Sequence, residues 1–428
     1  MSVYSAVSNC SRSFARRFLA SELTAERGAA IRAGRAGGTG TMPLDTQRGD
    51  LQQHMDGRIA VLKHTRGPWD FERYPVPDPE PGALIVKITY ANVCGSDLHW
   101  WRGEQAIDPR GRVMGHEMTG TIAALGAGVM TDSTGKPLAE GDRIIYNYFF
   151  PCGRCVACLR DQPEACPKKM RPGFKGRFGE PGVYPYFIAG FSEYYYLPPG
   201  HICVKVPDDL SDAVVAPINC ALAQVIQGLV SSGFRQGDSL VVQGAGGLGL
   251  NMIAAARDMG AASIIAVDGL PGRLKLALEF GADYTIDLRD CPTAADRIAF
   301  VKELTNGYGA THVADVAGVR GVVEEGIQML GNGGTYIEIG SIVPGFAFPL
   351  DPLRACRQGL RFVAFMQYDP RLLPRALNFV ERTRTRVPWD RVISHTFPLE
   401  GINEAFERAE WVGREPAEAL ITRAAVTP

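Results

Sequence analysis

Short apolar runs separated by turn residues dominate the first half of the chain. Branched and aromatic side chains fill five such runs, with Gly and Pro clusters between them, at 83–93, 118–126, 142–146, 192–197 and 202–206. Runs of this length and composition predict β-strands, because these side chains pack well on a pleated surface. This part of the chain therefore predicts a β-rich domain with irregular connections.

The pattern changes near residue 238, where apolar runs begin to alternate with segments of helical length. The runs are SLVVQ, SIIAV, YTI, THVADV, TYIEI and RFVAF. Strands that alternate with helices predict a doubly wound parallel sheet of the α/β class. After about residue 367 the pattern is mixed again, and LLPRALNFVERTR predicts a helix. The parallel sheet is therefore predicted to be inserted in the sequence of the β-rich domain.

These patterns divide the chain into three parts. We expect an extension over 1–55, a β-rich domain over 56–220 that is completed by 367–428, and a parallel-sheet domain over 221–366. A length of 428 residues also favours two domains, since single hydrophobic cores seldom grow that large.

One uncharged stretch, 213–234, is long enough to cross a bilayer. It contains Pro217, Asn219, Gln224 and Gln227, and it is only moderately apolar. A buried helix at the domain junction is therefore the better interpretation, and we expect no membrane partner.

The first 55 residues are rich in Ser, Ala, Gly and Arg and contain few acids. This composition is typical of an organelle transit peptide and equally of a disordered extension. We favour the extension, because Met55 begins a segment, MDGRIAVLK, with the pattern of a domain start. The expected location is the cytoplasm, or an organelle matrix if the segment is a transit peptide.

Charge and cysteine content limit the classes of partner. The formal net charge is −1, so no basic field points to nucleic acid or to an anionic membrane. Ten cysteines in a chain of this length do not form a secreted disulfide framework. We therefore expect a reducing compartment.

Four cysteines lie close together in the segment PCGRCVACLRDQPEACPKK. The spacing is C-x2-C-x2-C-x7-C, at Cys152, Cys155, Cys158 and Cys166. Four thiolates can form a closed tetrahedral shell around one zinc ion, which leaves no position open for substrate. A disulfide pair or a redox CxxC is the alternative, but three evenly spaced cysteines and a fourth fit a metal better. The cluster therefore predicts a structural zinc site.

A glycine-rich turn follows the run SLVVQ and precedes a helical segment. Its residues are Gly244, Gly246, Gly247, Leu248 and Gly249. Between a strand and a helix this pattern is typical of a dinucleotide site, because glycines let a pyrophosphate approach the helix N-terminus. A purely structural turn is the alternative.

Asp268 ends the next apolar run. A carboxylate at this position can accept both ribose hydroxyls of adenosine and repels a 2′-phosphate. The sequence therefore predicts NAD rather than NADP as the cofactor.

Three further segments contain residues that ligate metals or carry protons. VCGSDLHWWRGE, VMGHEMTG and APINCALAQ contribute Cys94, Ser96, Asp97, His99, His116, Glu117 and Cys220. The order C-x-S-D-x-H, GHE and a later Cys, with the cysteine cluster and the glycine-rich turn, resembles the zinc-containing medium-chain alcohol dehydrogenases over roughly 56–428. The resemblance implies a Rossmann domain inserted in a GroES-like catalytic domain, with NAD and two zinc ions per chain. It also implies a homodimer or homotetramer that pairs through the Rossmann sheet edge near TYIEIGSIVPG.

By this resemblance, Cys94, His116 and Cys220 bind the catalytic zinc and leave a fourth position for a substrate oxygen. Asp97 orients the ligand His116, and Glu117 lies beside the metal. Taken singly, each cysteine would more often be a buried core residue, and the joint order of the motifs reverses that interpretation.

The resemblance also implies a proton relay that begins at Ser96 and ends at His99, whose ordinary pKa lies near neutrality. Arg273 is implied on the adenosine side of the cofactor. A surface or packing role for His99 and a solvated helix-start role for Arg273 are the alternatives.

The predicted function is hydride transfer between a primary, secondary or polyol alcohol and NAD, which gives an aldehyde or ketone. The alternatives are a carbonyl or activated-alkene reductase on the same scaffold and a non-catalytic NAD-binding protein. Two long segments, 131–142 and 168–196, are expected either to cover the cleft or to decorate the surface.

Overall fold

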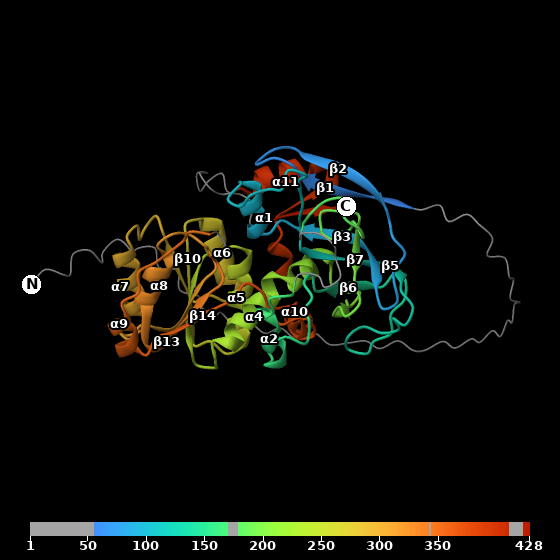
Figure 1. Ribbon diagram of the computed structural model, residues 1–428. Coiled ribbons are helices and arrows are strands. Elements are labelled where there is room, and N and C mark those ends of the chain that lie inside the picture. Colours follow the sequence, from blue (N-terminus) through green and yellow to red (C-terminus); the bar gives the residue numbers. More distant parts are fainter. Residues whose placement is uncertain (1–54, 170–178, 342–343, 411–422) are drawn as a thin grey trace, which may run out of the picture.

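A parallel sheet and a β-rich part lie side by side in the computed structural model (Figure 1). The structure describes residues 55–169, 179–341, 344–410 and 423–428. The expected extension thus lies outside the described residues, apart from Met55.

The β-rich part is built on a 7-stranded sheet. Its spatial order is β15 (His395–Pro398), β16 (Ala424–Thr427), β3 (Leu84–Asn92), β5 (Glu117–Leu125), β6 (Arg143–Tyr146) and β8 (Cys203–Lys205), with β7 (Tyr194–Leu197) paired to β3. A 3-stranded sheet accompanies it, in the order β2 (Trp69–Pro75), β1 (Asp56–Leu62) and β4 (Arg112–Val113). Strand β16 pairs with β3, so the end of the chain completes a sheet that its first half begins.

The second part is a 6-stranded sheet in which every neighbouring pair is parallel. Its order is β11 (Tyr284–Asp287), β10 (Ser263–Asp268), β9 (Ser239–Gln243), β12 (Ala310–Asp315), β13 (Leu330–Glu338) and β14 (Arg361–Ala364). The chain moves outward from β9 to β11 and then returns to β12 beside β9. Open parallel sheets bind ligands at such a switch point, at the carboxyl ends of the strands.

Helices cover both faces of the parallel sheet (Figure 1). They are α5 (Gly247–Asp258), α6 (Pro271–Phe280), α7 (Ala294–Leu304), α8 (Val322–Met329) and α9 (Pro352–Gln358). Because both faces are covered, the central strands β9 and β10 are buried along nearly their whole length. This burial explains their continuous apolar runs. The predicted α/β fold class is confirmed.

The junction between the two parts differs from the single helix expected over 213–234. The structure has α3 (Asp212–Val215), a 3-10 turn over Ala216–Asn219 and α4 (Ala221–Ser231), with a bend of 47°. The bend lies at Cys220, whose φ of −138° and ψ of −81° are not helical. Among the described residues no single helix is long and apolar enough to span a membrane, and this bent pair passes only on length and composition.

Shorter elements complete the β-rich part. They are α1 (Gly95–Trp101), α2 (Val156–Leu159), α10 (Leu373–Thr383), α11 (Ile402–Ala409) and 3-10 turns at Pro163–Ala165, Pro370–Leu372, Trp389–Arg391 and Leu399–Gly401. One hydrophobic cluster runs from Leu84 on β3 through Leu222 on α4 to Ala254 on α5. The two parts therefore share a continuous core below the cleft that separates their upper ends.

The structure bears on two expectations about surface segments. The edge strand of the parallel sheet is β14, so the TYIE segment expected at an oligomer contact lies one strand inward, on β13. Residues 131–142 form a turn held by Asp132, which accepts hydrogen bonds from the amides of Thr134, Lys136 and Lys205, and none of them lines the cleft. Of the other segment, 170–178 lie outside the described residues, and Ala189 reaches the cleft.

Candidate active site and metal centres

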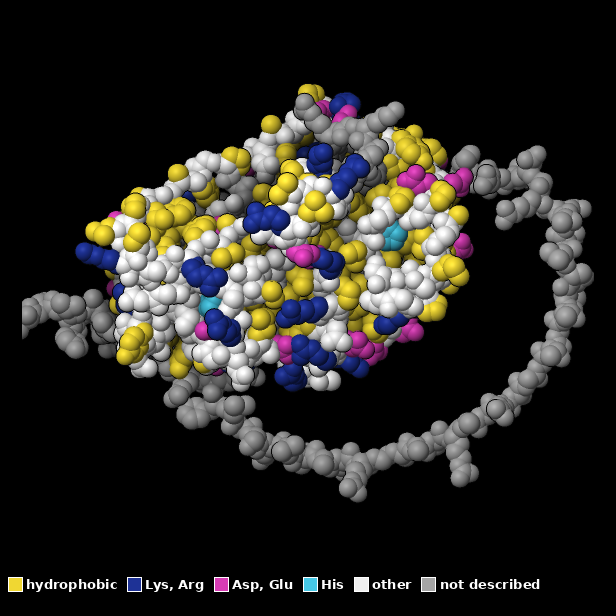
Figure 2. All heavy atoms as spheres, turned by 60° about the horizontal axis from the view of Figure 1, so that its bottom comes forward, with side chains coloured by type: hydrophobic (Ala, Val, Ile, Leu, Met, Phe, Trp, Pro, Cys, Tyr) yellow, Lys and Arg dark blue, Asp and Glu magenta, His cyan; other side chains and the backbone are white. Residues whose placement is uncertain are grey.

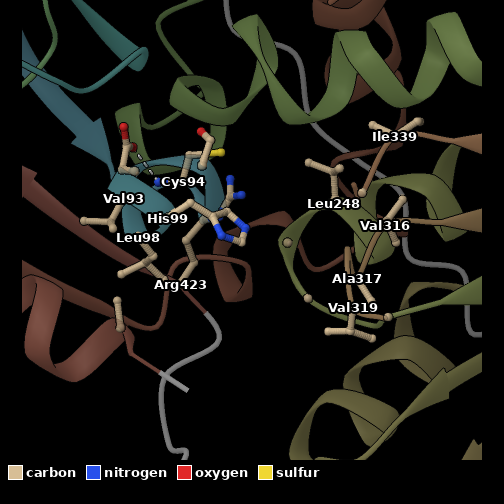
Figure 3. Close-up of a pocket in the computed structure, with 18 of the residues that line it drawn as sticks. Val93, Cys94, Leu98, His99, Leu248, Val316, Ala317, Val319, Ile339 and Arg423 are labelled. Atoms are coloured by element: carbon tan, nitrogen blue, oxygen red, sulfur yellow. Dashed lines mark hydrogen bonds between the residues drawn. The ribbon is translucent and has the colours of Figure 1, made fainter. Parts of the chain in front are cut away.

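A cleft of about 1250 Å³ separates the upper ends of the two parts. Figure 3 shows residues of the β-rich part on one wall, among them Cys94, His99 and Arg423. The facing wall comes from the parallel-sheet domain and includes Leu248, Val316, Ala317, Val319 and Ile339. The predicted metal ligands and the predicted cofactor turn thus face one cleft.

Four potential ligands meet at the first wall. Ligand atoms of Cys94, His116, Glu117 and Cys220 all lie within 4.8 Å of one another. Cys94 is the N-cap of α1, and Cys220 occupies the bend before α4. The sequence motifs are therefore brought together from three separate elements.

Local structure explains the position of His116. Gly115 precedes it with a φ of +93°, and a Cβ there would lie 2.7 Å from the backbone nitrogen of Phe191. This close approach requires glycine and directs the chain so that His116 faces the cleft at the start of β5. At Cys220, the Asn219 amide holds the bend by donating to the carbonyls of Met118 and Tyr146 at 3.2 and 3.0 Å.

The electrostatics of this cluster fit a zinc site. The hydrogen bond between Cys94 and Cys220 lowers the pKa of Cys94 and raises the pKa of Cys220. Burial lowers the pKa of His116, but the charges of Asp97 and Cys94 outweigh it and raise the pKa. Two facing sulfurs and an imidazole are the donors that zinc prefers, and zinc binding releases their protons.

Asp97 and Ser96 contact the imidazole of His116 on its two nitrogens. Asp97 Oδ1 lies 3.6 Å from His116 Nδ1, and Asp97 Oδ2 accepts a hydrogen bond from the Cys94 amide at 2.9 Å. Ser96 Oγ lies 3.4 Å from His116 Nε2. One carboxylate therefore caps α1 and orients the imidazole of His116.

His99 lines the cleft one helical turn beyond these residues. Its Nδ1 bonds to the carboxylate of Glu104, a partner that the sequence analysis did not identify. Glu104 follows α1 directly in the chain, five residues after His99, so local spacing was the only available signal.

Glu117 is fully buried and forms an ion pair with Arg423, which is also buried. The Asn92 amide donates to the same Glu117 oxygen, Oε2, at 3.3 Å. Burial raises the pKa of Glu117 to about 7, although the charge of Arg423 opposes the shift. Sequence reasoning missed Arg423, because a lone arginine near the end of the chain belongs to no local motif.

The cysteine cluster lies apart from the cleft. The sulfurs of Cys152, Cys155, Cys158 and Cys166 all lie within 4.8 Å of one another. Their contacts of 3.5 to 3.7 Å are far longer than a disulfide bond, and all four thiols are free. The backbone N–H of Arg154 lowers the pKa of Cys152 to about 6. This arrangement fits a closed metal shell rather than a disulfide pair.

The cofactor turn has the close approaches that its glycines permit. Gly244 has a φ of +107°, and a Cβ on Gly249 would lie 1.9 Å from the Gly244 carbonyl oxygen. Helix α5 begins at Gly247 with no side-chain cap, which leaves its first N–H groups for a ligand. The turn can therefore hold a pyrophosphate.

Asp268 lies at the end of β10 and lines the same cleft. Its two oxygens accept hydrogen bonds from the amides of Ala245 and Leu270 at 2.8 and 2.9 Å. Arg273 Nη1 lies 3.8 Å from Asp268 Oδ2 and also lines the cleft. The carboxylate thus has a fixed position, with one cation beside it.

Beyond the metal ligands, the cleft wall includes several apolar side chains. They are Leu98, Trp100, Met114, Tyr148, Ala189 and Met366. The Tyr148 ring lies 4.9 Å from the His116 ring, and Arg112 covers the Trp100 ring at 3.4 Å.

Comparisons with known proteins agree with this geometry. Residues 80–208 match the alcohol dehydrogenase GroES-like domain, and residues 247–382 match the zinc-binding dehydrogenase domain. The 5-exo-hydroxycamphor dehydrogenase of Pseudomonas putida is 31% identical over 83% of this chain and 95% of its own length. An alcohol dehydrogenase of Geobacillus stearothermophilus is 30% identical over 82% of this chain and 95% of its own.

Solved structures resemble the chain over most of its length. An alcohol dehydrogenase of Thermotoga maritima has a TM-score of 0.77 and 27% identity, covering 87% of this chain and 100% of its own. A candidate zinc-binding dehydrogenase of Sinorhizobium meliloti, solved with NADP, has a TM-score of 0.71 and 25% identity, covering 87% and 100%. These relatives are named as dehydrogenases, and the Sinorhizobium meliloti structure contains NADP. The protein belongs to the zinc-containing medium-chain alcohol dehydrogenases, which act on CH–OH groups.

Proposed function

We propose that the protein oxidises an apolar alcohol with NAD as the hydride acceptor, and that it holds one zinc ion in the cleft and a second in the cysteine cluster. One observation carries this proposal. The cluster of Cys94, His116 and Cys220 and the glycine-rich turn before α5 open into a single cleft. A metal site and a dinucleotide site that face each other suit hydride transfer.

The residues of the cleft account for both the hydride transfer and the proton transfer of this reaction. Cys94, His116 and Cys220 would hold a zinc ion, which would supply the Lewis acidity that lowers the pKa of an alcohol, and bound NAD would be the hydride acceptor. Ser96, beside His116, is positioned to take the hydroxyl proton from the substrate. His99, which lines the same cleft, passes that proton to solvent, and the bond from its Nδ1 to the Glu104 carboxylate fixes the orientation of its ring.

The preference for NAD rests on the Asp268 carboxylate. A 2′-phosphate on the adenosine ribose would meet this negative charge at the end of β10, whereas ribose hydroxyls can donate to it. Arg273 lies beside Asp268, and its positive charge would favour a phosphate. Comparing kcat/KM for NAD and NADP tests the preference.

The substrate class follows from the cleft wall. Trp100, Met114 and Met366 present apolar surface beside the metal ligands. An apolar alcohol would bury this surface, which favours it over a polyol. Relatives include a hydroxycamphor dehydrogenase, a geraniol dehydrogenase from Castellaniella defragrans and fungal xylulose reductases. Terpenoid and other cyclic or branched alcohols are therefore the first substrates to try.

The assembly is proposed to be a homodimer or homotetramer that pairs through β14. This edge strand carries Phe362, which is 41% exposed and stacks on Tyr336. Figure 2 shows basic side chains lying among acidic and apolar ones on the face it draws, a pattern that does not suit nucleic acid. The free thiols of both clusters suit a reducing compartment, and we propose the cytoplasm.

The experiment that tests the function measures NADH formation by the zinc-loaded full chain on a panel of terpenoid, benzylic, short-chain and polyol substrates. We expect the highest kcat/KM for apolar alcohols. The same panel is run with the matching carbonyl compounds and NADH, since the direction in the cell depends on concentrations. If protein with bound zinc and NADH showed no turnover of any substrate in either direction, the proposed function would be refuted.

A further inference from the structure

Two carboxyl groups that the reaction does not use lie side by side under the cleft. Asp315 ends β12 and Glu338 ends β13, and the parallel register pairs these two residues directly. Asp315 is completely buried. Both strands lie beyond the switch point, on the opposite side of β9 from Asp268.

Each carboxyl group holds one loop of the cleft wall. Asp315 Oδ1 accepts hydrogen bonds from the amides of Ala317 and Gly318 at 2.8 and 3.0 Å. Glu338 Oε1 accepts from the Ser341 amide at 2.8 Å. The Ser341 hydroxyl lies 3.5 Å from Asp315 Oδ2 and so links the two loops.

The two loops touch through their backbones. A Cβ on Gly318 would lie 2.2 Å from the Gly340 carbonyl oxygen, and a Cβ on Gly340 would lie 2.7 Å from Asp315 Oδ1. The neighbouring side chains Val316, Ala317 and Ile339 line the cleft (Figure 3). A small displacement of either carboxyl group would therefore move the wall that faces the metal ligands.

One oxygen of the pair lacks a donor. Glu338 Oε2 is buried and has no hydrogen-bond partner among the described residues. Two adjacent carboxylates repel, and the usual result is that they retain one proton between them. A shared proton would satisfy Oε2 and remove the repulsion. In agreement, burial followed by the charge of Asp315 raises the pKa of Glu338 to about 7, and burial raises that of Asp315.

Other titratable or charged groups lie on the elements packed around the pair. These groups are Tyr336 on β13, Glu324 and Glu325 on α8, Arg320 in the loop after β12, and Arg361 on β14. Glu325 is neutralised by its ion pair with Arg297 at 2.6 Å. The hydrogen bonds that fix the two loops do not involve these groups. The position of the loops should therefore depend on the protonation of Asp315 and Glu338 themselves.

We propose that Asp315 and Glu338 are positioning residues that share one proton and thereby hold the loops 316–318 and 339–341 in place for the nicotinamide half of the cofactor. Asp268 places the adenosine half of the cofactor at β10. The strands β12 and β13, on the other side of β9, therefore face the nicotinamide half. The inference rests on the proposed use of NAD. Loss of the shared proton would separate the loops and weaken NADH binding without changing the metal ligands.

The test is the Kd for NADH of the zinc-loaded full chain, measured by fluorescence between about pH 5.5 and 8.5. Above about pH 7 the wild-type Kd should rise by up to about tenfold per pH unit. Glu338→Gln keeps an acceptor for the Ser341 amide and adds a permanent donor to Asp315, so its Kd should stay flat. Glu303→Gln, on the exposed face of α7, is the matched control and should follow the wild type.

ADP-ribose separates this effect from others, because it lacks nicotinamide. Its Kd should not show the slope above pH 7 that Glu338→Gln abolishes. If Glu338→Gln fails to fold, Asp315→Asn serves instead, since its amide still accepts from the Ala317 and Gly318 amides and donates to Glu338. A flat wild-type profile, an unchanged slope in the variant, or the same slope with ADP-ribose would overturn the inference. Absence of NADH binding at every pH would overturn the cofactor assignment as well.

Discussion

Arg423 forms a buried ion pair with Glu117 and at the same time lies against the first residue of α5. A Cβ on Gly247 would lie 2.7 Å from Arg423 Nε, so the guanidinium spans the cleft from the metal cluster to the cofactor turn. Its positive charge therefore acts on both sites. The carboxylate beside the metal ligands and the anion expected at the helix N-terminus both favour a cation here.

Arg423→Met should destabilise the protein, because it leaves Glu117 buried without its cation. Removing one partner of a buried ion pair typically costs about 3 to 5 kcal/mol. We expect a lower Tm for Arg423→Met and substantial recovery in the double variant Arg423→Met with Glu117→Gln, where no charge remains unpaired. A double variant as unstable as the single one would show that Glu117 is not the group left uncompensated.

Cys220→Ser should remove the cleft zinc and leave the second site intact. A serine hydroxyl is a poor zinc ligand compared with a thiolate, so zinc content should fall from about two ions per chain to about one. Turnover should be lost, while NADH still binds, because the glycine-rich turn belongs to the other wall. Cys356→Ser removes an exposed cysteine outside both clusters and is the matched control. Retention of both zinc ions and of turnover would refute the ligand assignment.

Cys155→Ser should act on stability rather than chemistry. The cluster around Cys155 lies outside the cleft, and a closed zinc shell contributes folding free energy. We expect Tm to fall by at least about 5 °C, with kcat nearly unchanged at low temperature. Equal Tm values for Cys155→Ser and Cys356→Ser would contradict a structural metal at this site.

The local motifs of this chain were readable from the sequence, because their chemistry depends on close spacing. The four clustered cysteines, the glycine-rich turn and the Cys94 motif each occupy one short segment, and the structure brings Cys94, His116 and Cys220 into one cluster. The alternation of strands and helices likewise predicted the confirmed fold class. These features depend on nearest neighbours along the chain.

Features that depend on contacts between residues far apart in the sequence could not be predicted. Arg423 reaches the metal cluster because β16 pairs with β3, a contact between residues more than three hundred positions apart. The place of β14 outside β13, and the pairing of Asp315 with Glu338, both follow from strand order. Apolar periodicity predicts that strands exist, but it does not give their order in the sheet.

Asp268→Asn should reduce the preference for NAD. The amide oxygen can still accept from a backbone amide, so the turn keeps its shape, while the charge that repels a 2′-phosphate is lost. We expect the ratio of kcat/KM for NAD over NADP to fall by about 10- to 100-fold, the range for a hydrogen bond to a charged group. An unchanged ratio would assign cofactor choice to another residue, and Arg273→Ala measured in parallel would show whether that residue is the neighbouring arginine.

Glu338→Gln should also change how stability depends on pH. The pKa of Glu338 is raised to about 7 in the folded protein from an ordinary 4.5, so the folded state binds a proton that the unfolded state releases. Stability of the wild type must therefore fall as pH rises from about 4.5 through about 7, and then level off. The variant lacks this titration, so its Tm relative to the wild type should increase across that window. Thermal unfolding at several pH values, with Glu303→Gln as control, measures the difference, and parallel profiles for Glu338→Gln and the wild type would show that the pair does not hold the proton.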